Sequence, residues 1–134
     1  MNPDLTRRIW TRAAHRCEYC HLPANTYPLP FHIDHIIARQ HGGETHPDNL
    51  ALACLHCNRH KGPNIAGVDP ITGSLSRLFH PRKDNWTMHF EWAGHELRGK
   101  TSVRRVTIEV LAINDPDFRA VRAQLMSEGA YAVP

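Results

Sequence analysis

The residues best suited to chemistry are four cysteines and the polar side chains between them. The cysteines form two identical Cys-x-x-Cys pairs with 33 residues between the pairs: Cys17, Cys20, Cys54 and Cys57. Four thiolates at about 2.3 Å complete the tetrahedral shell of a structural zinc ion. In a secreted mini-protein the same pairs would suggest two disulfides, whereas in a reducing compartment they favour zinc. A redox role of the thioredoxin kind is weaker, because it needs one such pair within a βαβ unit.

The composition is that of an ordinary globular protein, with 134 residues, 41% hydrophobic and 22% charged. No apolar run approaches the roughly 18 residues that a membrane helix needs. The start Met1-Asn2-Pro3-Asp4 is not the basic beginning of a secretory signal. We therefore expect a cytoplasmic protein with no membrane partner, which favours zinc at the cysteines. The net charge of +3 is mildly basic and by itself identifies no partner.

Histidines are concentrated in the segment that begins after the loop following Cys20 and ends just beyond Cys57. Six of the eleven lie from His32 to His60, and Asp34 stands directly before His35. Because four thiolates already saturate a zinc ion, these histidines are available for a second, open site. Such a cluster is a stronger signal than a lone histidine would be.

The segment that must position these side chains has the pattern of a strand, a glycine-rich loop, a second strand and a helix. Residues 31–37 are a β-prone run, Gly42-Gly43 is a flexible break, and residues 50–53 form the return strand. Residues 54–61 suit a short helix, which Gly62-Pro63 would end. One Cys-x-x-Cys pair precedes this unit, and the other lies at the start of its helix.

Helices are expected elsewhere from Pro3 to about Arg16, over about residues 103–111, and after an Asp115 cap with Pro116 at the first position. Residues 86–92 alternate like a half-buried strand. We expect one α+β domain over residues 1–134, with a zinc-bound core at about 15–63. An N-terminal helix precedes the core, and a strand-plus-helices extension follows at about 64–134.

The central segment resembles the HNH endonuclease family, through Asp34-His35-Ile36, Gly42-Gly43, Asn49-Leu50 and Cys54-x-x-Cys57-Asn58-x-x-Lys61. The resemblance covers about residues 17–61, a third of the chain. The extension is also similar to that of small stand-alone HNH proteins, at residues 67–70, 81, 86 and 89–90. The resemblance implies a ββα-metal (His-Me finger) core, stapled by a structural zinc on the four cysteines, that acts on nucleic acid, with double-stranded DNA the expected partner.

The resemblance also implies a role for each catalytic candidate. His35 would be the general base that takes a proton from the attacking water. Asp34 and Asn58 would bind one divalent cation, Mg²⁺ or Mn²⁺, through oxygen ligands. Two protein oxygens leave open positions on that cation for water and the scissile phosphate. Asn49 would hydrogen-bond across the loop and position the base, although its place after Pro47-Asp48 also suits a plain turn residue.

Four further residues are expected to contact nucleic-acid phosphates: Arg39, His41, Arg59 and Lys61. His41 stands beside the two glycines, and the other three are cationic. His32 shares strand parity with Asp34, so a position facing the site and a packed or solvated position are both open.

Two alternative functions compete with an endonuclease. A catalytically inactive zinc-ribbon module that binds nucleic acid or protein explains the cysteines and the basic charge, but not the catalytic candidates. A zinc deaminase needs a His-x-Glu pair and a proline before the second Cys-x-x-Cys, and the sequence has neither. The endonuclease accounts for more of the residues.

Overall fold

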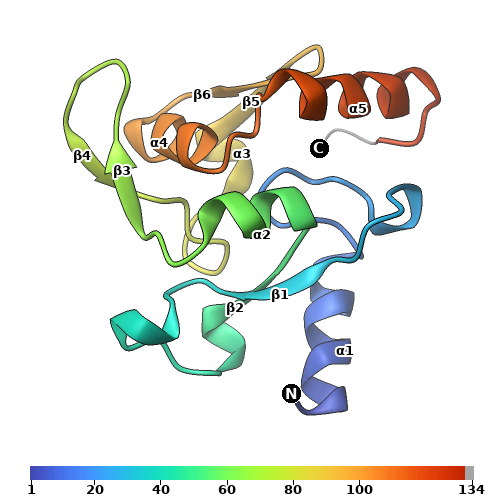
Figure 1. The fold of residues 1–134 in the computed structure, drawn as a ribbon, viewed down its shortest axis with the longest axis vertical. Coiled ribbons are helices and arrows are strands. Elements are labelled where there is room, and N and C mark those ends of the chain that lie inside the picture. Colours follow the sequence, from blue (N-terminus) through green and yellow to red (C-terminus); the bar gives the residue numbers. More distant parts are fainter. Residues whose placement is uncertain (132–134) are drawn as a thin grey trace.

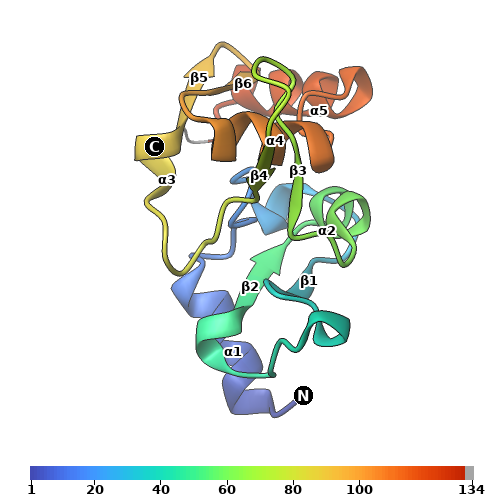
Figure 2. The ribbon, with the colours of Figure 1, turned by 90° about the vertical axis from the view of Figure 1, so that its left-hand side faces the viewer.

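The computed structural model describes residues 1–131, in which a β-β-α unit lies between an N-terminal helix and a longer C-terminal region (Figure 1). Turning the molecule by 90° shows α1 at one end and the elements from β5 to α5 at the other (Figure 2). In this part of the chain no helix is both long and apolar enough to cross a membrane. The arrangement is a small mixed α/β fold with short elements.

The β-β-α unit contains β1 (His32–His35), β2 (Leu50–Ala53) and α2 (Leu55–Lys61). β1 and β2 pair antiparallel, and the loop between them holds two 3₁₀ turns, η2 (Arg39–His41) and η3 (Pro47–Asn49). All four residues of β2 are buried, as expected for an apolar strand covered on both faces. The predicted order of strand, loop, strand and helix is confirmed.

The second cysteine pair begins α2, and the first pair precedes the β-β-α unit. Cys54 is the N-cap of α2, and its sulfur accepts a hydrogen bond from the Cys57 amide at 3.4 Å. α2 ends at Gly62, where φ is +49° and a side chain would be strained. The first pair lies in the turn before η1 (Ala24–Thr26). There the Cys17 amide donates a hydrogen bond to the backbone oxygen of Leu22 at 2.9 Å.

α1 (Pro3–Arg12) begins where the sequence predicts it and ends earlier. The Asn2 side chain accepts hydrogen bonds from the amides of the first turn, as an N-cap does. The expected end at about Arg16 is wrong, because Ala14 and His15 adopt left-handed conformations with φ of 53° and 56°. Ile9 packs against β2 in a small buried cluster.

The C-terminal region consists of two hairpins, one helical turn and two helices: β3 (Ala66–Val68), β4 (Leu75–Arg77), α3 (Trp86–His89), β5 (Phe90–Ala93), β6 (Glu96–Gly99), α4 (Ser102–Val110) and α5 (Pro116–Ser127). The helices predicted at α4 and α5 are confirmed, with Pro116 at the first position of α5, although the Asp115 side chain makes no capping hydrogen bond. The three-residue strands β3 and β4 were not predicted, because such short runs show no clear alternation.

The strand predicted over residues 86–92 is wrong in its first half. Asn85 accepts a hydrogen bond from the Thr87 amide at 3.0 Å and so caps a helical turn. The Trp86 indole donates to the backbone oxygen of Tyr19 at 3.0 Å, which holds this turn against the first cysteine pair. The strand begins only at Phe90.

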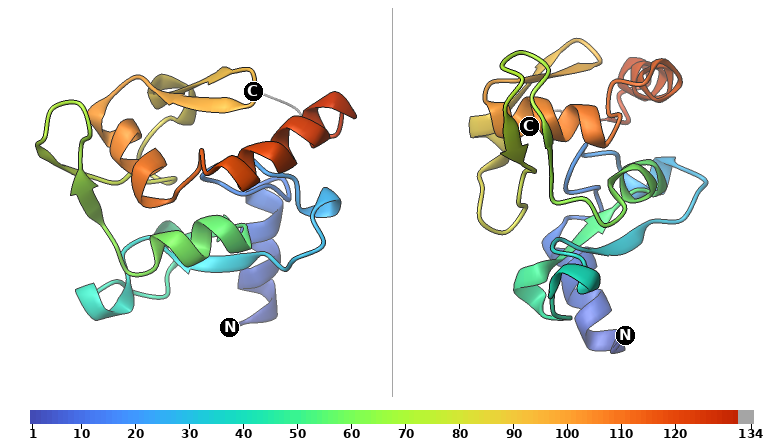
Figure 3. Two further views of the ribbon diagram at one scale, coloured as in Figure 1. Left: turned by 45° about the horizontal axis from the view of Figure 1, so that its top comes forward. Right: turned by 60° about the vertical axis from the view of Figure 1, so that its left-hand side comes forward.

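One buried cluster joins the β-β-α unit to the C-terminal region. It includes Tyr19 and Leu22 from the first cysteine pair and Phe79, Phe90 and Leu97 from the later region. α2 lies between β1 and the helices α4 and α5 (Figure 3). The extension therefore supports the side of the unit that carries the cysteines.

Candidate active site and metal centre

The four cysteine sulfurs form one cluster in the structure. They lie within 4.8 Å of one another, and all four side chains are fully buried. Cys20 Sγ and Cys54 Sγ are 3.8 Å apart, and none of the cysteines is disulfide-bonded. Sulfurs placed tetrahedrally at 2.3 Å from an ion are about 3.8 Å apart. The cluster can therefore bind a structural zinc ion.

Burial and contacts among the thiols shift the pKa values of three of these cysteines. Burial raises the pKa values of Cys54 and Cys57 well above that of an ordinary thiol. Burial also acts to raise the pKa of Cys17, but hydrogen bonds from the other three thiols bring it well below the usual range. Zinc binds thiolates, so a cation bound at this cluster would favour deprotonation of the sulfurs.

A separate, open cavity of about 290 Å³ lies between β1 and α2. Asp34, His35 and Asn58 all line it, with Arg39 and Gly62 among its other lining residues. β1 supplies the carboxylate and the imidazole, and the second turn of α2 supplies the carboxamide. The fold thus brings three of the four predicted catalytic residues to one cavity.

Asp34 is buried in this cavity and held by two side chains. The Tyr19 hydroxyl donates to Oδ2 of Asp34 at 2.8 Å, and the Lys61 ammonium lies 3.1 Å from the same oxygen. Lys61 also donates to the backbone oxygen of His35 at 3.2 Å. Burial raises the pKa of Asp34, while the charge of Lys61 and the Tyr19 hydrogen bond act to lower it.

Both partners of Asp34 lie in the two chain segments that carry the cysteines. Tyr19 lies inside the first Cys-x-x-Cys pair, and Lys61 ends the helix that Cys54 begins. A closed metal cluster would fix both segments, and through them the position of the Asp34 carboxylate. Tyr19 and Lys61 therefore link the cysteine cluster to the Asp34 carboxylate.

The position of Lys61 differs from the phosphate contact expected from the sequence. Its side chain is only 1% exposed and is paired with a carboxylate, so the ammonium is not on the surface. Arg39 is exposed at the cavity, and His41 and Arg59 are exposed on η2 and α2. Three of the four predicted phosphate contacts are accessible to a ligand.

Asn49 lies outside the cavity and braces the loop between β1 and β2. Its amide nitrogen donates to the backbone oxygens of Ile37 at 3.0 Å and Glu44 at 2.8 Å, and its oxygen accepts from the Ile37 amide at 2.9 Å. Next to Glu44, the Thr45 hydroxyl lies 2.8 Å from Nε2 of His35. The Asn49 side chain therefore joins two parts of the loop by hydrogen bonds, which a simple turn residue would not do.

Tyr19 and Thr45 were not singled out in the sequence. The sequence does give one indication for Tyr19: it lies inside a Cys-x-x-Cys pair, so its side chain must lie near the cysteine cluster. Thr45 had none, because it stands in a loop without periodicity.

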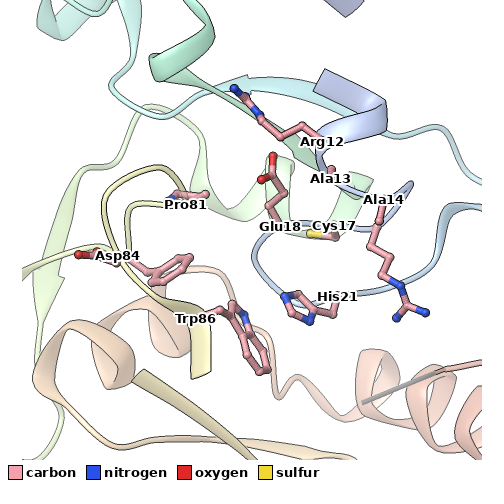
Figure 4. Close-up of a pocket in the computed structure, with 11 residues that line it drawn as sticks. Arg12, Ala13, Ala14, Cys17, Glu18, His21, Pro81, Asp84 and Trp86 are labelled. Carbon is pink, nitrogen blue, oxygen red and sulfur yellow. The ribbon is translucent and has the colours of Figure 1, made fainter. Parts of the chain in front are cut away.

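A second cavity, of about 410 Å³, lies beside Cys17 and contains no candidate catalytic residue (Figure 4). Its acidic side chains are already paired, Glu18 with Arg82 and Asp84 with Arg77. The Glu18–Arg82 pair holds the loop after β4 against the first cysteine pair, and the Asp84–Arg77 pair braces that loop against β4. We therefore regard this cavity as structural.

The fold and site define a small mixed α/β protein with a four-cysteine cluster. Residues 17–64 match the family model described as HNH endonuclease, which covers 48 of the 134 residues. The resemblance expected from the sequence is confirmed for this segment, and the cysteine cluster fits a zinc-stapled variant. HNH domains generally belong to nucleases, so the match indicates a role on nucleic acid. Neither the curated proteins nor the solved structures contain a significant match to the chain.

Proposed function

We propose that this protein is a metal-dependent endonuclease that hydrolyses phosphodiester bonds in double-stranded DNA. Its centre would be a ββα-metal core in residues 17–64, working as one unit with the extension. The observation that carries the proposal is the shared cavity of Asp34, His35 and Asn58 within the segment that matches the HNH family. A carboxylate and a carboxamide can hold one divalent cation through oxygen, and an imidazole can act as the general base beside it.

The proposed catalytic cation, Mg²⁺ or Mn²⁺, would be held by Asp34 and Asn58. Both offer oxygen, which hard divalent cations prefer, and the cavity is open enough to admit water and a phosphate. When bound, the cation would neutralise charge on the scissile phosphate and on the leaving oxygen. Until then, the Lys61 ammonium balances the buried carboxylate.

His35 would accept a proton from water as the water oxygen attacks phosphorus. The breaking bond would be that between phosphorus and the leaving sugar oxygen. Arg39, at the same cavity, would contact a phosphate oxygen and hold the strand in register. Asn49 would act at a distance, by holding the loop that follows β1.

We propose duplex DNA by analogy with the HNH family, and exposed side chains suited to phosphate contacts lie on both elements beside the cavity. Arg39 and His41 belong to η2, and Arg59 belongs to α2. Such contacts recognise the phosphate backbone rather than base sequence, and they weaken as salt rises. Base specificity should accordingly be modest.

The direct test is incubation of the purified protein with supercoiled plasmid in Mg²⁺, Mn²⁺ or EDTA, beside the His35→Ala variant. We expect nicking with either cation and none in EDTA. Loss of the base should lower the cleavage rate roughly 10²- to 10⁴-fold. Zinc content and melting temperature should stay the same, because His35 is not a cysteine-cluster ligand.

His60→Ala is the matched control, since His60 is exposed on α2 only two residues beyond Asn58. That variant should cleave at the wild-type rate. A His35→Ala protein that nicks as fast as wild type would refute the base assignment. Wild-type protein that binds plasmid without cutting it in either cation would instead support an inactive binding module.

A further inference from the structure

We infer that Thr45 is a positioning residue that holds the His35 imidazole with Nε2 protonated, so that Nδ1 is the atom that takes the proton from water. The inference rests on the proposed function, because it assigns an atom to the proposed base. Thr45 stands in the loop between η2 and η3, ten residues after His35.

The starting observation is the 2.8 Å separation between Nε2 of His35 and Oγ1 of Thr45. A neutral imidazole has one protonated nitrogen and one nitrogen with a free lone pair. Since Nε2 is already in contact with the hydroxyl, the attacking water has only Nδ1 available. For Nδ1 to accept a proton, Nε2 must carry the hydrogen and donate it to the hydroxyl oxygen, which can accept it.

The loop that carries Thr45 is held closely against the end of β1. A Cβ added at Gly43 would lie 1.7 Å from the backbone oxygen of Ile37, so only glycine allows this approach. The Asn49 amide then joins the backbone oxygens of Ile37 and Glu44, at 3.0 and 2.8 Å. Thr45 follows Glu44 directly, so Asn49 acts on the imidazole through Glu44 and Thr45.

The hydrogen bond is exposed to solvent, which limits its strength. Intramolecular hydrogen bonds of this kind contribute about 0.5–1.5 kcal/mol net, which corresponds to about a threefold to tenfold change in rate. The ring would still reach the water without Thr45, but would spend less time in the productive orientation and tautomer. We therefore expect a lower kcat and an unchanged KM.

The experiment compares wild-type protein with Thr45→Val, Thr45→Ser and Thr87→Val in a DNA-cleavage assay with Mg²⁺. Valine keeps the shape of threonine and removes the hydroxyl, whereas serine keeps the hydroxyl. Thr87→Val is the control, because it removes an exposed hydroxyl hydrogen bond in α3, away from the cavity. We expect about a threefold to tenfold fall in kcat for Thr45→Val alone, with near wild-type kcat for the other two.

A second readout does not depend on cleavage: the tautomer of His35 from the ¹⁵N shifts of its ring at a pH where the ring is neutral. Wild-type protein should show Nε2 protonated and Nδ1 unprotonated, and Thr45→Val should show a mixture of both tautomers. Wild-type protein with Nδ1 protonated would overturn the inference, even if Thr45→Val failed to fold. So would a Thr45→Val protein with unchanged kcat. If wild-type protein shows the expected tautomer but cuts no DNA, the proposed function fails and the hydrogen bond stands.

Discussion

The two candidate metal sites of this protein both use residues of the β-β-α unit, and they differ in ligand type, burial and openness. The cysteine cluster is closed, with four fully buried sulfurs within 4.8 Å of one another. The cavity of Asp34, His35 and Asn58 is open and contains oxygen and nitrogen donors. A closed shell of four ligands suits a structural ion, while an incomplete shell leaves room for substrate.

In this arrangement a closed cluster can stabilise the fold while a neighbouring open cavity remains free for chemistry. The cysteine cluster ties residues near position 17 to the start of α2, and Tyr19 and Lys61 carry that constraint to Asp34. A small hydrophobic core alone would hold an open, charged cavity poorly, because the buried carboxylate lacks solvent. Perturbing each site should therefore have distinct consequences.

The largest effect is expected from Cys54→Ser. Removing one thiolate weakens zinc binding, and the free energy of structural zinc is folding free energy, about 10–16 kcal/mol in zinc-finger peptides. We expect loss of bound zinc and of cooperative thermal unfolding, measured by metal analysis and circular dichroism. A soluble variant with the wild-type melting curve would contradict the view that the cluster stabilises the fold.

A smaller effect is expected from Lys61→Met, which removes the positive partner of a carboxylate that is itself only 6% exposed. Breaking a buried ion pair from one side typically lowers the free energy of unfolding by about 3 kcal/mol or more. Urea denaturation at neutral pH measures this loss. Zinc content should remain at the wild-type level.

The matched control is the double variant Lys61→Met with Asp34→Asn, which leaves no unpaired charge and should lose less stability than Lys61→Met alone. Added Mn²⁺ should restore stability to Lys61→Met, because a cation that binds only the folded state stabilises it. Equal recovery by the double variant would show that Mn²⁺ acts away from Asp34.

The smallest effect is expected from Tyr19→Phe, and it appears as a pH shift. Burial raises the pKa of Asp34, and the Tyr19 hydrogen bond opposes that rise. The carboxylate binds a cation only when deprotonated, so cation binding is lost as pH falls through this pKa. Without the hydroxyl the pKa rises further, and the loss of cation binding should move to higher pH.

Mn²⁺ affinity measured from pH 4 to 8 by electron paramagnetic resonance tests this shift, with zinc content followed in parallel. Tyr27→Phe is the control, since Tyr27 is half-buried and lies outside the cavity. Superimposable profiles for Tyr19→Phe and wild type would show that the hydroxyl does not tune Asp34.

Local patterns predicted the β-β-α unit well because each element has a strong local cause. The apolar run of β2, the Cys54 cap and the Gly62 stop all act within a few residues. The same reasoning failed at residues 86–89, where the Asn85 cap competes with an alternating pattern. Residue propensity and hydrophobic periodicity predict secondary structure poorly where a helix cap and a tertiary contact both favour another conformation.

The residue types available for each site follow from the sequence, since the spacing of the cysteines and the Asp34-His35 pair are local facts. Which side chains contact the candidate catalytic residues depends on the folded chain: Lys61 lies buried against Asp34, and the Thr45 hydroxyl lies against His35. The reason is physical. Sequence periodicity reports which face of an element is buried, whereas a partner across the fold depends on the path of the loops between them.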